Sequence, residues 1–196
     1  MTSVTLSKDQ KATAEQRIAT AGFSSKINVL FRDYREMSVP KALYDKIVSI
    51  EMVEHVGPHF LETYFGIVDR LLNAKNNIAV FQSSTISDSI YRRTSTAKEF
   101  VSEYIFPGGY LPSATQLVET ISKGSSDWLC LGRVEYFGSY YARALQCWRE
   151  DFLRRFDSDI RPTLLRKLPS MTGSDIEIFR RKWQVCARAP EQFMQD

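Results

Sequence analysis

A carboxylate follows the most apolar stretch of the chain, at a point where it could do acid–base chemistry. Glu54 comes three residues after the nearly continuous apolar run 44–51, and its neighbours Met52, Val53 and Val56 are apolar. A carboxylate in such surroundings is a candidate general base or a group that orients an anion. The alternative is an acid at the N-terminus of a helix, where the helix dipole favours it.

Two further side chains could act with this carboxylate. Gln82 follows the apolar segment Ile78–Phe81, and its amide can donate a hydrogen bond to an anion although it carries no charge. Tyr141 lies in an aromatic stretch, where its phenol could orient an anion or stabilise positive charge. The alternatives are a polar strand end for Gln82 and a core or interface aromatic for Tyr141.

The first half of the chain alternates between strand and helix patterns. Strands are predicted at Val4–Ser7, Lys26–Phe31, Tyr44–Glu51 and Ile78–Phe81, and helices at Lys8–Ala21, closed by Gly22, and at Phe60–Asn73. This βαβ alternation predicts a parallel, doubly wound sheet, in which ligands bind beyond the carboxyl ends of the strands. The continuous apolarity of 44–51 predicts a strand buried on both faces.

The second half of the chain is less regular. Residues 83–126 are rich in hydroxyl, glycine and proline residues and predict an insert with irregular loops, with 85–113 as a candidate lid. A helix is expected at Gln116–Lys123, a strand at Trp128–Phe137, and helices at Tyr140–Phe156 and Asp175–Val185. No internal repeat is visible.

Composition indicates an ordinary soluble domain. The chain has 196 residues, of which 43% are hydrophobic and 25% charged, and its net charge of +3 is too small to suggest a nucleic-acid partner. No apolar run is long enough to span a bilayer, and three widely spaced cysteines with two histidines favour neither disulfides nor a metal site. We therefore expect a cytoplasmic protein. The pairs Arg92-Arg93 and Arg154-Arg155 and the cluster 180–182 could contact anionic lipid peripherally, or simply form solvated helix faces.

Four short sequences resemble the cyclopropane-fatty-acid and mycolic acid cyclopropane synthases. They are VTLSKDQ at 4–10, DYR at 33–35, SIEMVEHVG at 49–57 and YIFPGGYLPS at 104–113, and the resemblance extends from about residue 4 to about residue 183. It implies a single α/β, Rossmann-like class I methyltransferase domain with helical insertions over 1–196. It also implies S-adenosylmethionine as cofactor and an unsaturated phospholipid acyl chain as substrate, which gains a cyclopropane ring. A homodimer is among the states expected.

The resemblance also assigns roles to residues. It implies that Glu54 helps to hold a bicarbonate ion that accepts a proton, together with a main-chain group after the following strand. Gln82 stands where many members have histidine, and Tyr141 matches a tyrosine of the same anion site. The remaining matches imply contacts with the cofactor, by Thr5, Leu6, Ser7 and Gln10 to its ribose and methionine parts and by Asp33 and Tyr34 to its adenine. Without the resemblance, Ser7 is a helix N-cap, Gln10 a solvated side chain and Asp33 a turn residue.

One part of the family pattern is not found in this sequence. There is no G-x-G-x-x-G turn, and Met1 is followed almost at once by what matches the second strand of the sheet. We expect the domain to lack its first strand and glycine-rich loop, which leaves neighbouring strands with unpaired edges. Residues 182–186 are also less aromatic than in the family. Two alternatives remain open: an inactive or partner-dependent truncated homologue, and a related lipid C-methyltransferase that adds an unbridged methyl group.

Overall fold

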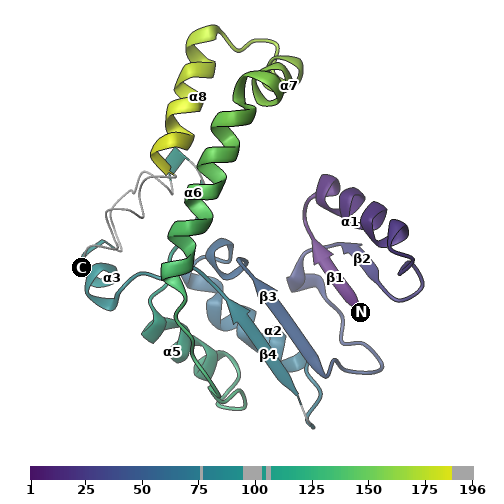
Figure 1. Ribbon diagram of the computed structural model, residues 1–196. Coiled ribbons are helices and arrows are strands. Elements are labelled where there is room, and N and C mark those ends of the chain that lie inside the picture. Colours follow the sequence, from purple (N-terminus) through teal and green to yellow (C-terminus); the bar gives the residue numbers. More distant parts are fainter. Residues whose placement is uncertain (76, 95–102, 105–106, 187–196) are drawn as a thin grey trace. The chain divides into compact units, whose positions relative to one another are not determined.

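The computed structural model describes residues 1–75, 77–94, 103–104 and 107–186. The chain divides into two compact units. The first comprises residues 1–88 and 111–130, and the second comprises residues 89–110 and 131–196. Figure 1 shows the elements of both units, and each unit is described by itself below.

The first unit begins with a two-stranded parallel sheet. Strand β1 (Thr2–Thr5) pairs with β2 (Asn28–Phe31) in a register that sets Thr5 beside Phe31. Helix α1 (Lys8–Thr20) connects them, and it is tied to β2 by Lys11, whose Nζ donates to the Val29 carbonyl at 2.6 Å. The predicted strand–helix–strand order of this segment is confirmed.

A second two-stranded parallel sheet follows in the same unit. Strand β3 (Lys46–Ile50) pairs with β4 (Ile78–Gln82), so that both carboxyl ends lie at one edge. Helix α2 (Leu61–Leu71) connects the two strands and covers one face of the sheet (Figure 1). The buried Tyr64 hydroxyl on α2 donates to Ser49 Oγ of β3 at 2.7 Å, and the Phe65 ring meets the Phe81 ring of β4 at 5.2 Å between centroids.

The prediction that β3 is buried on both faces is wrong. Ser49 faces α2 and is buried, but Val48 is 63% exposed and Ile50 is 64% exposed. Ile78 and Val80 of β4 are similarly exposed. Among the described residues of this unit, a helix covers only the side of the sheet that carries Ser49, so the apolar residues that alternate with it stay open to solvent.

Helix α5 (Ala114–Gly124) packs tightly against α2, and two glycines make the contact possible. A Cβ atom on Gly124 would lie 2.4 Å from the Glu62 carbonyl oxygen, and one on Gly66 would lie 2.8 Å from the Gly124 carbonyl oxygen. Both distances are far inside van der Waals contact. The predicted helix at 116–123 is confirmed, and it forms part of the core of this unit.

The regular elements described in the second unit are helices. Helix α6 (Gly138–Arg155) continues into a π-helical turn, η4 (Phe156–Ile160), and then into α7 (Arg161–Lys167) and α8 (Gly173–Cys186). Phe156 is fully buried, with the Arg161 and Arg180 guanidinium groups 5.7 and 5.1 Å from its ring centre. The two predicted helices are confirmed. Helix α7, which begins at Arg161-Pro162, was not predicted.

The strand predicted at 128–137 is wrong. These residues form neither helix nor strand, and Ser126 and Asp127 just before them have positive φ angles of 50° and 67°. Leu131 and Val134 are each about half exposed. The composition of this segment favours a strand, but no neighbouring strand among the described residues pairs with it. Without such a partner, composition alone does not specify a strand.

The predicted insert at 83–126 includes helix α3 (Asp88–Thr94) and helix α5 among its described residues. A bridge between Ile86 and Ser113 joins its ends within the first unit. Residues 95–102 and 105–106 lie outside the described chain, and a lid in this region stays a prediction. Within the described residues, no helix is long and apolar enough to cross a membrane.

Candidate functional site

The turns that follow β3 and β4 are joined by three hydrogen bonds. The Glu51 amide donates to the Gln82 carbonyl at 2.9 Å, and the Gln82 side-chain amide donates to the Glu51 carboxylate. Further along the two turns, the Ser84 amide donates to Glu54 Oε1. The carboxyl edge of this sheet therefore holds two carboxylates, one bound to the last residue of β4 and one to the segment after β4.

Glu54 is the buried member of this pair. It lies in the short helix η2 (Val53–His55), only 6% exposed, beside Val53 at 0% and Val56 at 8%. One carboxylate oxygen accepts from Ser84, whereas Oε2 has no hydrogen-bond partner among the described residues. A buried carboxylate oxygen without a partner is costly, so this atom marks a place where a ligand with a hydrogen to donate would fit.

The side chain of Gln82, at the end of β4, donates a hydrogen bond from Nε2 to the Glu51 carboxylate. Its predicted part in an anion site with Glu54 stays a prediction. Because an ionised carboxylate can only accept hydrogen bonds, this contact also fixes which end of the Gln82 amide points at Glu51. One N–H and the carbonyl oxygen of the amide remain for other partners.

Glu51 is the residue of this edge that sequence reasoning missed. Its φ angle is +52°, the left-handed region that residues other than glycine enter at a cost of roughly 1–2 kcal/mol. The signal in the sequence was a charged residue directly after an apolar strand, within the segment 49–57. Only the backbone angle and the contact with Gln82 show that it belongs to the site.

The residues predicted to bind the cofactor at the end of β1 form a connected loop. The Thr5 hydroxyl donates to Gln10 Oε1 at 2.7 Å and accepts from the Ser7 amide at 3.1 Å. Ser7 caps α1 by accepting from the Gln10 amide at 3.2 Å, and Leu6 is 66% exposed. The N-cap interpretation of Ser7 is therefore confirmed, and contact of this loop with a cofactor stays a prediction.

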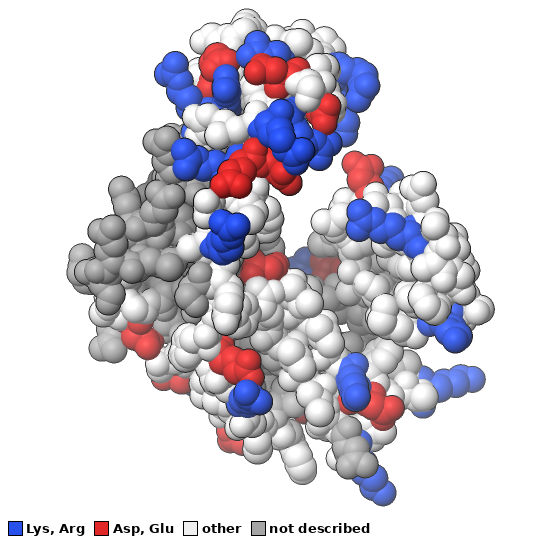
Figure 2. Space-filling model, in the orientation of Figure 1, with Lys and Arg blue, Asp and Glu red and all other residues white. Residues whose placement is uncertain are grey.

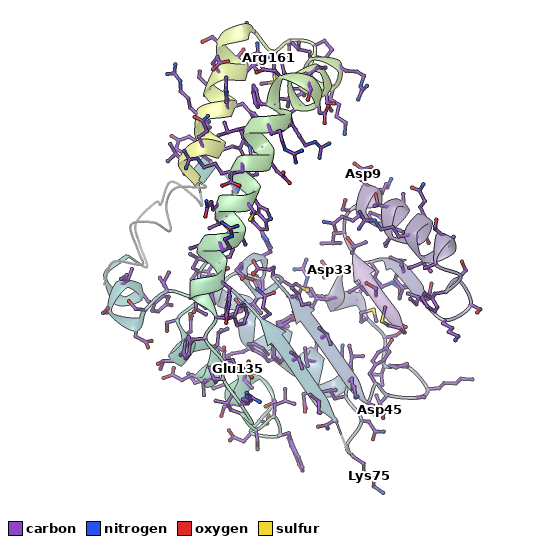
Figure 3. The ribbon with its side chains drawn as sticks, viewed as in Figure 1. Asp9, Asp33, Asp45, Lys75, Glu135 and Arg161 are labelled. Atoms are coloured by element: carbon purple, nitrogen blue, oxygen red, sulfur yellow. The ribbon has the colours of Figure 1, made fainter. Side chains whose placement is uncertain are left out.

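Asp33 and Tyr34 lie at the end of the neighbouring strand β2 (Figure 3 labels Asp33). Asp33 caps the short helix η1 (Tyr34–Glu36) by accepting from the Arg35 amide, and its carboxylate also accepts from the Arg35 guanidinium at 2.5 to 3.1 Å. Hydrogen bonds from Arg35 lower the pKa of Asp33. The carboxylate thus stays ionised, and the turn interpretation of Asp33 holds.

Tyr34 connects the two strand ends within the first unit. Its ring meets the Tyr64 ring edge-on at 5.1 Å, and Tyr64 in turn bonds to Ser49 of β3. Partial burial raises the pKa of Tyr34, so its phenol is neutral at physiological pH. An aromatic face beside an ionised acceptor suits an adenine ring, as the sequence predicts.

Tyr141, the remaining predicted catalytic residue, belongs to the second unit. It lies in α6, is 41% exposed, and its ring meets Trp148 edge-on at 6.3 Å. Because Trp148 is 61% exposed as well, the two rings do not form part of a buried core. A part for Tyr141 in an anion site stays a prediction.

The basic clusters are largely paired with acids. Arg154 and Arg155 bond to Asp151 and Asp159, and Arg180 lies 3.9 Å from Glu177. Figure 2 shows Lys and Arg interspersed with Asp and Glu on the face that it draws. The side chains of 92 and 93 lie outside the described residues. A solvated helix face describes Arg154 and Arg155, whereas Arg180 packs over the buried Phe156 ring. No group of His, Cys, Asp and Glu in the described chain could hold a metal ion.

Known sequences identify the family. The sequence model of the mycolic acid cyclopropane synthetase family matches residues 1–167. The chain belongs to this family. It is 33% identical over 183 residues to the tuberculostearic acid methyltransferase of Mycobacterium tuberculosis. This alignment covers 93% of the chain and 39% of that relative. It is 32% identical over 152 residues to the cyclopropane-fatty-acyl-phospholipid synthase of Escherichia coli. That alignment covers 76% of the chain and 35% of the relative. The chain thus spans less than two fifths of the length of these curated relatives.

Solved structures confirm the predicted α/β, Rossmann-like methyltransferase fold. A cyclopropane synthase from Mycobacterium tuberculosis superposes with a TM-score of 0.74 at 19% identity, over 97% of this chain and 65% of that one. A mycolic acid cyclopropane synthase complexed with SAH and CTAB gives a TM-score of 0.72 at 22% identity, again over 97% and 65%. At these identities the likeness shows the fold alone.

Proposed function

We propose that this chain handles the cofactor and the reacting double bond in an S-adenosylmethionine-dependent transfer of one carbon to an unsaturated phospholipid acyl chain, forming a cyclopropane ring. The observation that carries the proposal is Glu54, a buried carboxylate with one unpartnered oxygen at the carboxyl edge of β3 and β4. Family membership supports it, as does the SAH present in one solved structure of the same fold.

Glu54 suits a step in which a proton must leave. When the double bond takes up the methyl group that S-adenosylmethionine supplies, the acyl chain carries positive charge until a proton leaves the added carbon and the ring closes. Bicarbonate is a base for this step whose own O–H could bond to Glu54 Oε2, the atom without a partner. Ser84 would hold the other carboxylate oxygen in place.

The other residues of the first unit would bind the cofactor. The loop Thr5, Leu6, Ser7 and Gln10 presents hydroxyl and amide groups at the end of β1. Asp33 and Tyr34 present a carboxylate and an aromatic ring at the end of β2, the strand next to it. Because the parallel register sets Thr5 beside Phe31, both groups reach the same edge of the sheet, where α/β proteins bind ligands.

A cytoplasmic protein with such a substrate must meet it at a membrane surface. We therefore propose peripheral contact with phospholipid. The mild net charge of +3 is compatible with an anionic surface, and a homodimer is a further proposal that sedimentation would test.

Two measurements test the proposed reaction. Calorimetric titration with S-adenosylmethionine should show saturable binding to the chain, and absence of binding at millimolar cofactor would leave an inactive or partner-dependent homologue. The chain should then convert dioleoylphosphatidylglycerol in vesicles to products heavier by one CH₂ unit that have lost the double bond. A lipid of unchanged mass would overturn the proposal.

A related lipid C-methyltransferase is the second candidate. It is favoured by the 33% identity with a protein named as a tuberculostearic acid methyltransferase. Because both products gain one CH₂ unit and have equal mass, ozonolysis before mass spectrometry decides between them. A methylene-branched product keeps a double bond and is cleaved, whereas a ring is not.

A further inference from the structure

The backbone of Glu51 is strained at a position where no fold requirement explains a glutamate. With φ at +52°, this residue occupies the left-handed region directly after β3. Glycine would occupy that region without cost. Strain of this kind persists where the surrounding structure imposes it, and it gathers at functional sites.

The carboxylate of Glu51 makes one specific contact. It accepts a hydrogen bond from the Gln82 side chain, while the Glu51 main-chain amide donates to the Gln82 carbonyl at 2.9 Å. Glu51 directly follows Ile50, which lies opposite Gln82 in the register of the sheet. The strained backbone thus directs the Glu51 carboxylate at the side-chain amide of Gln82, the last residue of β4.

We infer that Glu51 is a positioning residue of the site: its carboxylate orients the Gln82 amide and commits one N–H of that amide, leaving the other N–H and the carbonyl oxygen for the reactants. The contact between Glu51 and Gln82 rests on geometry alone, whereas its effect on turnover rests on the proposed function. It differs from the expected role of Gln82 as a free donor to an anion.

The charge of Glu51 gives the arrangement its direction. An ionised carboxylate accepts and never donates, so it admits only the amide nitrogen of Gln82. A neutral glutamine at position 51 could accept or donate, and the Gln82 amide could then turn over. A glycine at position 51 would remove both the contact and the strain.

The contact can be tested by NMR whether or not the chain turns lipid over. In ¹⁵N-labelled full-length chain, the Gln82 side-chain NH₂ signals, assigned by their loss in Gln82→Ala, should move in Glu51→Gln and stay in place in the control Glu62→Gln. Gln82 signals that are unchanged in Glu51→Gln would overturn the inference and leave the proposed function standing.

Stability and turnover then separate positioning from a structural role. Glu51→Gly should unfold at the same temperature as the wild type or higher, because it relieves a left-handed backbone. Its kcat with S-adenosylmethionine and dioleoylphosphatidylglycerol vesicles should fall at least about tenfold with little change in KM. The double variant Glu51→Gly/Gln82→Ala should be no slower than Gln82→Ala, since Glu51 acts through Gln82. A melting temperature lowered by several degrees, or additive losses of kcat, would contradict a positioning role. Glu62→Gln, on the exposed side of α2, is the matched control.

Discussion

At the scale of single residues, the site is defined by how two glutamates three positions apart differ. Glu54 is buried with an unpartnered oxygen, whereas Glu51 is exposed and bound to Gln82. The sequence singled out Glu54 because its neighbours are apolar. It could not single out Glu51, because a backbone angle and a side-chain contact leave no mark in residue types.

Replacing Glu54 by glutamine should separate chemistry from folding. The amide oxygen of Glu54→Gln can still accept from Ser84, and the loss of a buried charge offsets the loss of any ionic contact, so the melting temperature should stay within a few degrees of the wild type. Turnover should fall by about 100-fold or more, as when a group that handles a proton is lost. Glu62→Gln serves as the control. Full activity in Glu54→Gln would remove this residue from the proton step.

Tyr64 should make the protein sensitive to alkali. Burial raises its pKa above the ordinary value of 10.0, so the folded state holds the phenol proton more tightly than the unfolded state. This stabilisation is complete below pH 10 and is lost as the pH rises through the folded pKa. The free energy of unfolding, measured with urea, should therefore fall more steeply above pH 10 in the wild type than in Tyr64→Phe.

The same substitution should also cost stability at neutral pH. Tyr64→Phe leaves the buried Ser49 hydroxyl without its donor, at a cost of about 1–2 kcal/mol at pH 7. Tyr140→Phe, at a site that is 76% exposed, should keep both the neutral stability and the alkaline slope of the wild type. Equal slopes in wild type and Tyr64→Phe would show that the buried phenol is not the titrating group.

At the scale of elements, the pairing of α2 with α5 depends on two glycines that the sequence did not single out. Glycine to alanine normally stabilises a helix by up to about 1 kcal/mol. In Gly124→Ala the new methyl carbon would meet the Glu62 carbonyl oxygen at 2.4 Å, so we expect a loss of about 1–3 kcal/mol instead. Chemical denaturation would measure it. Gly132→Ala, where nothing lies within 4 Å, should be neutral, and a neutral Gly124→Ala would mean that the helices pack less closely.

Patterns with local causes predicted the elements well, and patterns that depend on neighbours did not. Ser7 and Gly22 bound α1 through a side-chain cap and a positive φ, both written in residue types. The burial of Val48 and Ile50 depends on what covers the second face of the sheet, and the strand expected at 128–137 depends on a partner strand. Such non-local conditions cannot be read from the segment itself.

At the scale of the whole molecule, the two parallel strand pairs of the first unit present their predicted ligand groups at carboxyl ends, where α/β sheets bind ligands. Three of the four short segments that carry the resemblance, at 4–10, 33–35 and 49–57, lie at strand ends, where residue types are constrained by ligands rather than by packing. The roles of individual residues need measurements of binding.

Binding of the cofactor should appear as a gain in global stability. A ligand that binds only the folded chain stabilises it by about 2.7 kcal/mol at 100 times its Kd, so S-adenosylmethionine should raise the melting temperature in proportion to the logarithm of its concentration. Asp33→Ala removes both the predicted adenine acceptor and the cap of η1, and Tyr34→Ala the predicted stacking ring. Each variant should need more cofactor for the same increment over its own unliganded melting temperature. Glu15→Gln on α1, which pairs only with Lys11 among the contacts described, should respond as the wild type does. Increments that are unchanged in both Asp33→Ala and Tyr34→Ala would place the adenine elsewhere, because a weaker fold alone lowers the starting temperature and not the ligand-dependent gain.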